Sequence, residues 1–170
     1  TFTNESTGII NLSGAGEDCM DIGDVLVNEG TVIANDCGNQ TIVDGTFNNN
    51  TDAILSADGL ISSSSTVFAA NSILEVGNSP GCITFTQGED FLGAILRFEI
   101  EGTNICTEYD NIEVGGAMTL TDAVLELSGS YTPQLNDEFI ILQNDNTTDA
   151  VIGTFTGLSQ GSTIRFNNTE

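Results

Sequence analysis

Acidic side chains are the residues of this sequence that could do chemistry. The 170 residues include 25 Asp and Glu but only two basic side chains, Arg97 and Arg165, and no histidine. Mechanisms that need an imidazole base or ligand are therefore excluded. Three acidic pairs could supply a general acid and a general base of the kind that glycosidases use: Glu17-Asp18, Glu89-Asp90 and Asp137-Glu138. We interpret these pairs as solvated loop residues and expect no catalytic residues and no enzymatic activity.

A second group of carboxylates could bind calcium. Glu17, Asp18, Asp21 and Asp24 bring hard oxygen ligands into one segment, residues 14–24. Neither the EF-hand pattern nor the glycine-rich nonapeptide of calcium-binding β-rolls occurs in the sequence. The segment is therefore a candidate calcium site, with a diffuse acidic surface as the alternative, and we expect no other metal and no cofactor.

The charge balance restricts the partners. The formal net charge is −23. Nucleic acids and anionic membranes are bound through clustered Lys and Arg, so we expect neither as a partner. No run approaches the 18 or so apolar residues of a transmembrane helix, and we expect no membrane insertion. Because the chain starts at Thr1 and not at Met, we expect a processed or excised piece whose targeting signal has been removed.

Four cysteines indicate the compartment. Cys19, Cys37, Cys82 and Cys106 form no C-x-x-C pair, and no histidine completes a mixed metal site. An even number in an acidic chain without lysine favours disulfides in an extracellular or cell-surface setting, the alternative being four buried thiols. Three pairings are open. We favour Cys19 with Cys37 and Cys82 with Cys106, because each pair is separated by about one repeat of the chain.

The elements that position these residues are short β-strands. Leu96, Phe98 and Ile100 alternate with Arg97 and Glu99, and similar alternation recurs along the chain, whereas helical periodicity is nearly absent. Alternation predicts strands with one buried face. The sequence therefore indicates an all-β protein.

An internal repeat indicates how these strands are arranged. Asn4, Asn28, Asn49 and Asn71 each lie two residues after an apolar or small residue, and they are 24, 21 and 22 residues apart. A repeat of this length without helices is typical of a parallel β-solenoid, in which each coil buries its inward side chains against the next. We predict a parallel β-solenoid of about 21–24 residues per coil.

The asparagine column allows two interpretations. In the first, the side chains of Asn4, Asn28, Asn49 and Asn71 stack into an amide ladder and satisfy one another and the turn backbone. In the second, they form a face that binds sugar or ice. We favour the ladder, because asparagine at a turn has a sufficient local reason to be there.

We predict one continuous domain, residues 1–170, in two parts. Residues 1–76 carry the regular short repeats and residues 77–170 carry longer strands, since no linker long enough to divide the chain is present. In the second part we expect strands near 82–87, 94–101, 109–114, 117–121, 123–128, 138–143, 151–156 and 162–166.

The second part also carries motifs of a known family. Residues 77–81 (GNSPG), 96–102 (LRFEIEG) and 107–114 (TEYDNIEV) form an ordered series, which residues 131–142 (YTPQLNDEFIIL) and 153–158 (GTFTGL) continue. The series resembles the turns and strands in β-helical passenger regions of bacterial autotransporters and related surface adhesins. The resemblance implies a right-handed parallel β-helix, on the cell surface or secreted from it, that serves as a stalk or adhesive fibre. It carries over no catalytic residue.

Together these features predict a non-enzymatic structural protein. The first and last coils of a solenoid expose strand edges, and apolar residues lie at both termini: Phe2 and residues 164–166. We expect head-to-tail association between copies, or continuation of a longer surface protein, through these edges. The alternatives are a carbohydrate- or ice-binding module and, more weakly, a β-helix polysaccharide hydrolase or lyase.

Overall fold

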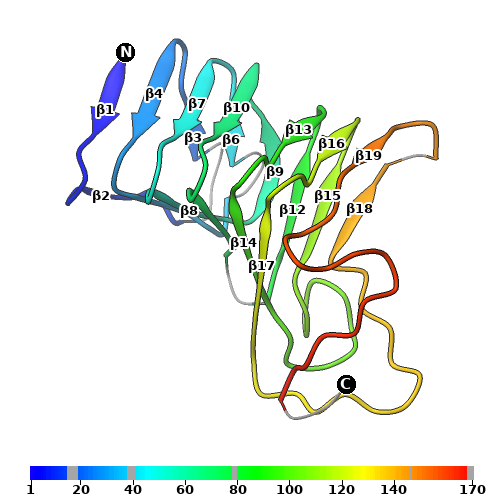
Figure 1. Cartoon of the computed structure of the whole chain (residues 1–170). Coiled ribbons are helices and arrows are strands. Elements are labelled where there is room, and N and C mark those ends of the chain that lie inside the picture. The colour runs from blue at the N-terminus through cyan, green and yellow to red at the C-terminus, as the bar shows by residue number, and fades with distance from the viewer. Residues whose placement is uncertain (15–18, 38–40, 78–79, 146, 168–170) are drawn as a thin grey trace.

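The computed structural model describes residues 1–14, 19–37, 41–77, 80–145 and 147–167. Within these ranges the protein contains strands and turns and no helix, so the all-β prediction is confirmed. The strands form four sheets (Figure 1). In spatial order, sheet A contains β1 (Phe2–Asn4), β4 (Val25–Asn28), β7 (Thr46–Asn49) and β10 (Ser65–Phe68). Sheet D contains β13 (Glu89–Asp90), β16 (Met118–Thr119) and β19 (Val151–Ile152).

The two larger sheets have six strands each. Sheet B contains β17 (Val124–Ser128), β14 (Ile95–Glu99), β11 (Ile73–Val76), β8 (Ile54–Ala57), β5 (Thr31–Ala34) and β2 (Ile9–Asn11). Sheet C contains β18 (Leu142–Asn144), β15 (Asn111–Val114), β12 (Cys82–Phe85), β9 (Gly59–Ser62), β6 (Ile42–Val43) and β3 (Met20–Asp21).

Strand pairing follows one rule throughout the four sheets. Each pairing is parallel and joins a strand to the strand three positions later in the chain, so β1 pairs with β4, β2 with β5 and β3 with β6. Parallel neighbours need a long connection, and here the two intervening strands supply it. Strand β13 of sheet D contacts β10 of sheet A, so sheet D follows sheet A along the molecule (Figure 1).

The distance along the chain between paired residues is less regular than the repeat predicted. Fewer residues separate Ile54 from its partner Ile73 than separate any two neighbouring asparagines of the predicted column. More residues separate Ile95 from its partner Val124. The longest step joins Met118 to Val151 in sheet D. The coil length expected from the asparagine spacing is therefore too narrow a range, because the turns between strands accommodate both deletions and insertions.

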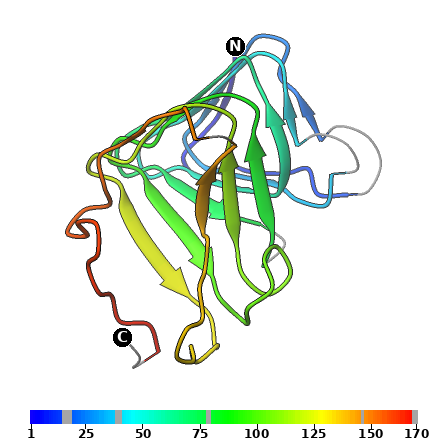
Figure 2. The ribbon, with the colours of Figure 1, turned by 90° about the vertical axis from the view of Figure 1, so that its right-hand side faces the viewer.

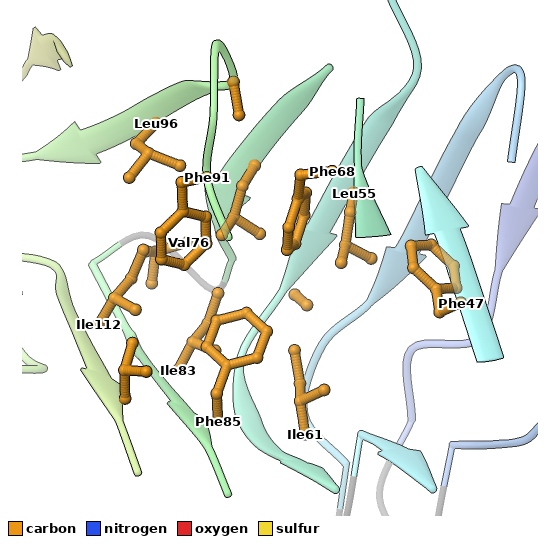
Figure 3. Packing of buried hydrophobic residues seen from close by; sticks show 14 of the residues in the cluster. Phe47, Leu55, Ile61, Phe68, Val76, Ile83, Phe85, Phe91, Leu96 and Ile112 are labelled. Carbon is orange, nitrogen blue, oxygen red and sulfur yellow. The ribbon is translucent and has the colours of Figure 1, made fainter. Parts of the chain in front are cut away.

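Alternating side chains fill one hydrophobic core. Leu96 and Phe98 of β14 are 0% and 1% exposed, whereas Arg97 between them faces outward. Strand β12 alternates in the same way, and in β15 the less buried Glu113 lies between buried Ile112 and Val114. Buried hydrophobic residues from all four sheets contribute to one cluster, part of which Figure 3 shows. The predicted alternation is thus confirmed, and the sheets of both parts of the chain share their interior.

Several strands are shorter than predicted. The segment expected near 109–114 begins as β15 at Asn111, because Tyr109 is held by the preceding loop: its carbonyl accepts from Cys106 N, and it forms an antiparallel bridge with Ile100. Residues 162–166 form no strand of a sheet. Instead, the Asn167 side chain donates to the carbonyls of Gly129 and Tyr131. This end of the chain therefore returns beside the segment that follows β17 (Figure 2).

The two ends of the stack of strands are built differently. At the N-terminal end, β1, β2 and β3 are the outermost strands of sheets A, B and C. At the C-terminal end, residues after β19 run back over the last strands, and Thr156 N donates to Ala123 O at 2.7 Å. The N-terminal end therefore presents strand edges, while the chain itself covers part of the other end (Figures 1 and 2).

Candidate functional site: the asparagine ladder and the N-terminal edge

Three of the four predicted asparagines form a buried ladder. Asn4, Asn28 and Asn49 lie in register on β1, β4 and β7. Asn4 Nδ2 donates to Asn28 Oδ1 at 2.8 Å, and Asn28 Nδ2 donates to Asn49 Oδ1 at 2.8 Å. The residues are 6%, 0% and 0% exposed in chain order. Burial of these amides is tolerated because each one is hydrogen-bonded.

Backbone carbonyls orient the ladder. Each Nδ2 also donates to a carbonyl of the following strand level: Thr31 O at 3.1 Å, Ile54 O at 2.9 Å and Ile73 O at 3.0 Å. Asn49 Nδ2 also donates to Ala53 O at 3.2 Å on its own level, so both protons of each amide have acceptors. Each of the three amides has at least one acceptor on the next level toward the C-terminal end. The ladder has a polarity.

Asn71 is not part of the ladder, and this prediction was wrong. The residue in register with Asn49 is Phe68, which is 5% exposed. Asn71 lies exposed in the following turn with φ 63°, where its N–H donates to Gly93 O and its carbonyl accepts from Asp52 N. The step from β7 to β10 is three residues shorter than the asparagine repeat assumed. The asparagine therefore falls in a left-handed turn position, which asparagine and aspartate tolerate.

An aromatic cluster replaces the ladder beyond Asn49. Phe68, Phe85 and Phe91 pack together, with ring centroids 5.4–6.1 Å apart. Figure 3 shows the three rings pointing toward one another in the core. The interior thus changes from hydrogen-bonded amides to packed rings between β7 and β10.

The ladder is open at its N-terminal end. Asn28 Oδ1 accepts from Asn4 Nδ2 and from Gly30 N, whereas Asn4 Oδ1 receives no hydrogen bond from the described residues. The outermost strands beside it carry exposed apolar side chains: Phe2 is 59% exposed and Ile9 is 71% exposed. An unpaired edge with apolar side chains is a template for another strand.

Disulfides close two loops. Cys19 is bonded to Cys37, and Cys82 is bonded to Cys106. These are the pairs favoured from their spacing. The first bond ties the residue before β3 to the segment after β5, and the second ties the first residue of β12 to the loop between β14 and β15.

The candidate calcium ligands are only partly described. Glu17 and Asp18 lie outside the described residues. Asp21 and Asp24 are exposed, and an oxygen of Asp24 lies 2.8 Å from the amino group of Thr1. In the parts of the chain that the structure describes, no three Asp, Glu, Cys or His side chains gather closely enough to hold a metal ion.

The two acidic pairs that the structure describes, Glu89-Asp90 and Asp137-Glu138, were expected to be solvated loop residues. Glu89 is 8% exposed, and desolvation, with a smaller contribution from Asp90, raises its pKa to about 8. Its Oε2 has no hydrogen-bond partner in the described chain. In the other pair, Asp137 is half-buried and accepts from Gln134 N and from the Tyr131 hydroxyl, which lowers its pKa. The expectation of a simple solvated pair is therefore wrong for Glu89.

A polar cleft lies on the outer face of sheet B. It has a volume of about 580 Å³ and surrounds Arg97. The guanidinium donates to Glu75 at 2.5 Å and to Glu126 at 2.6 Å, so its charge is already balanced. Asp110 at the rim accepts from Gly81 N and Glu99 N, and burial raises its pKa to about 6. The Arg97 ion pairs link side chains of β11, β14 and β17, which are already paired through their backbones.

Sequence reasoning missed the burial of Glu89 and Asp110. Glu89 precedes Asp90 in a segment that has the composition of a loop, and only the pairing of β13 with β16 turns its side chain inward. Asp110 follows Tyr109 in a strand-like pattern, and its two backbone donors, Gly81 and Glu99, lie 29 and 11 residues before it. Neither position carries a local signal of burial.

Comparison with known proteins adds no relative. No protein-family model, no curated protein and no solved structure matches the chain. Among the described residues, the structure has no helix with the length and apolar character needed to span a membrane.

Proposed function

We propose that the four parallel sheets are the faces of one right-handed parallel β-helix. Sheet D continues the face that sheet A begins, so the four sheets make three faces. The pairing of strands three positions apart supports this interpretation, since a chain that winds around one axis through three faces brings each strand beside the strand three positions later. The shared core and the ladder of asparagines in register support it as well.

The β-helix serves as a non-enzymatic building block of an extracellular surface fibre, filament or adhesin stalk. Two disulfides favour an oxidising location outside the cytoplasm. The motifs that resemble autotransporter passenger regions favour the cell surface. The asparagine ladder and the hydrophobic cluster of the interior both bind one level of strands to the next. An interior of this kind suits a stalk.

The unit joins its neighbour head-to-tail through exposed strand edges. The neighbour is another copy or another part of a longer surface protein. The observation that carries this proposal is the N-terminal edge. Strands β1, β2 and β3 are outermost there, and β1 and β2 carry the exposed side chains of Phe2 and Ile9. Backbone pairing at such an edge supplies affinity, and a non-closing contact between unlike ends produces a linear assembly.

Sedimentation and electron microscopy over a salt series test the proposal. A net charge of −23 makes copies repel one another, and at physiological salt the screening length is about 8 Å. We expect linear assemblies to grow as salt rises from 10 mM to 500 mM. Monomers alone at every salt concentration would contradict association between copies.

The alternative, a carbohydrate- or ice-binding module, would be supported by a flat column of threonines in register on neighbouring strands, and the threonines of sheets C and D form no such column at the positions below. Thr84 lies between Leu60 and Glu113 on sheet C, and Thr119 lies between Asp90 and Ile152 on sheet D. These threonines thus have unlike neighbours. The geometry favours the structural role.

A further inference from the structure

We propose that Asn11 is an acceptor site for N-glycosylation and that the fold selects it over the asparagines of the ladder. The sequence contains six Asn-x-Ser/Thr sequons, which begin at Asn4, Asn11, Asn39, Asn49, Asn146 and Asn167. The proposal rests on the extracellular location proposed above, because sequons are used on the surfaces of secreted proteins. It does not depend on the association of copies.

Three sequons can be compared in the structure. Those that include residues 38–40, 146 or 168–170 lie partly outside the described chain. The sequons of Asn4, Asn11 and Asn49 lie wholly within it. The comparison is therefore between Asn11, the last residue of β2, and two residues of the ladder.

The ladder asparagines cannot carry a glycan in the folded chain. Asn4 and Asn49 are 6% and 0% exposed, and the Nδ2 protons of both donate to buried acceptors. A sugar on Nδ2 replaces one of these protons and places a bulky polar group in the interior. Their sequons are open only while the chain is unfolded.

Asn11 lies on the outer face of sheet B. Ile10 packs against the hydrophobic cluster, so the next residue of β2, Asn11, faces outward and is exposed. Asn11 is in register with Ile33, and the same column continues through Ser56 to Arg97 of the polar cleft. The exposure of Asn11 therefore follows from the direction of its side chain, and not from the place of β2 at the edge of the sheet.

A local turn presents the Asn11 carboxamide. Asn11 Oδ1 accepts from Ser13 N at 3.0 Å, whereas Asn11 Nδ2 donates to no residue of the described chain. Leu12, between them, packs against the core and donates its N–H to Ile33 O. The nitrogen that receives the sugar and the hydroxyl that completes the sequon thus belong to exposed residues of one fixed turn.

The transfer needs one co-reactant, a sugar whose anomeric carbon is bonded to a pyrophosphate oxygen. A bond forms between Asn11 Nδ2 and that carbon, and the bond from the carbon to the pyrophosphate oxygen breaks. The substituted pyrophosphate leaves with the electron pair, and one Nδ2 proton passes to a base of the transferase. Lipid-linked oligosaccharides and nucleotide sugars share this chemistry, so both are tested below.

Glycosyl transfer to the folded and the unfolded chain tests the proposal. In one arm the disulfide-bonded protein is incubated with an oligosaccharyltransferase and a lipid-linked oligosaccharide. In the other arm it is incubated with a soluble N-glycosyltransferase and a nucleotide sugar. The reduced and alkylated chain is treated in the same way, and peptide mass spectrometry gives the occupancy of each sequon.

The ratio of occupancies at Asn11 and Asn49 is the readout. Its value in the unfolded chain reports the preference of the enzyme for the local sequence. We expect folding to raise the ratio at least about tenfold, because Asn49 becomes reachable only when the ladder opens. An unchanged ratio, or no transfer to Asn11 in either arm, overturns the proposal.

Two matched variants identify the acceptor. Ser13→Ala removes the hydroxyl from the Asn11 sequon and should abolish transfer to the folded protein at that site, whereas Ser13→Thr should retain it. Ser6→Ala makes the same change in the Asn4 sequon and should leave the modification of the folded protein unaltered. Equal losses in Ser13→Ala and Ser6→Ala would contradict selection by the fold. An unmodified Asn11 leaves the association of copies to its own salt series, and monomers in that series leave Asn11 unaffected.

Discussion

The interior of this protein is built in two ways. From β1 to β7 the column beside the turns consists of three hydrogen-bonded asparagines, whereas from β10 onward the core is filled by Phe68, Phe85 and Phe91. The steps between paired residues stay short in the first region and lengthen in the second, where Met118 pairs with Val151.

The difference shows what each kind of column can do. A carboxamide has a donor end and an acceptor end, so an asparagine ladder fixes the register and gives the stack a direction. Packed rings have no such direction and adapt to insertions by small shifts of side chains. The region with the ladder therefore keeps a strict register, and the aromatic region tolerates long loops.

The largest predicted effect lies in the aromatic region. Phe85→Ala should destabilise the protein by about 4 kcal/mol, because the residue is 1% exposed and its ring packs against both Phe68 and Phe91. Urea denaturation measures the change. A loss below about 1 kcal/mol would show that the rings do not form the core of this region.

A buried carboxyl in the same region gives a pH-dependent prediction. Burial raises the pKa of Glu89 from 4.5 to about 8, so its contribution to stability is fully present below pH 4.5 and is lost as the pH rises through 8. Glu89→Gln removes this loss and should stabilise the protein at pH 7 by about 3 kcal/mol. Thermal unfolding from pH 4 to pH 9 measures the slope.

The neighbouring residue is the control for Glu89. Asp90 is exposed, and Asp90→Asn makes the same change of charge next to it. We expect the pH slope to persist in this variant and to disappear in Glu89→Gln. Identical slopes in the two variants would mean that the Glu89 carboxyl is solvated.

The ladder predicts an intermediate effect with a matched control. Asn28→Asp should cost about 2 kcal/mol at pH 7, because it places a carboxylate against Asn49 Oδ1 and Ile54 O in place of a donor. Asn71→Asp should change stability by less than about 0.5 kcal/mol, since Asp52 and Asp122 already occupy equivalent left-handed turn positions. Chemical denaturation measures the free energy of unfolding of the two variants. Equal losses of stability would show that Asn28 contributes no more than an exposed turn residue.

The smallest effect is expected on the outer face. Arg97→Gln breaks the ion pairs with Glu75 and Glu126, whose side chains are 34% and 46% exposed. Exposed pairs contribute little, so the loss should stay below about 1 kcal/mol and shrink further at high salt. Denaturation at 20 mM and 500 mM salt measures both quantities. A loss that is large and independent of salt would indicate a buried role for Arg97.

The sequence was sufficient for the class of fold because alternation and turns are local signals. Leu96, Phe98 and Ile100 reveal their buried face through their spacing alone, and Asn4, Asn28 and Asn49 reveal a repeat. Asn71 failed as the fourth rung because a shift of three residues between β7 and β10 depends on how the turn closes. That choice is decided by packing around Phe68.

The candidate site was predictable only in part for the same reason. The ladder residues could be identified from their spacing, but their direction of donation depends on the carbonyls of Thr31, Ile54 and Ile73. The burial of Glu89 depends on β16, whose Met118 is its partner in register although it lies far away along the chain. Long-range pairing of this kind leaves no trace in the neighbouring residues.

Side-chain amide exchange measures the central feature, a directional column of buried carboxamides, most directly. In the natural chain, nuclear magnetic resonance should show the Nδ2 protons of Asn28 exchanging at least about a hundredfold more slowly than those of Asn71. Comparable rates for the two residues would contradict the ladder.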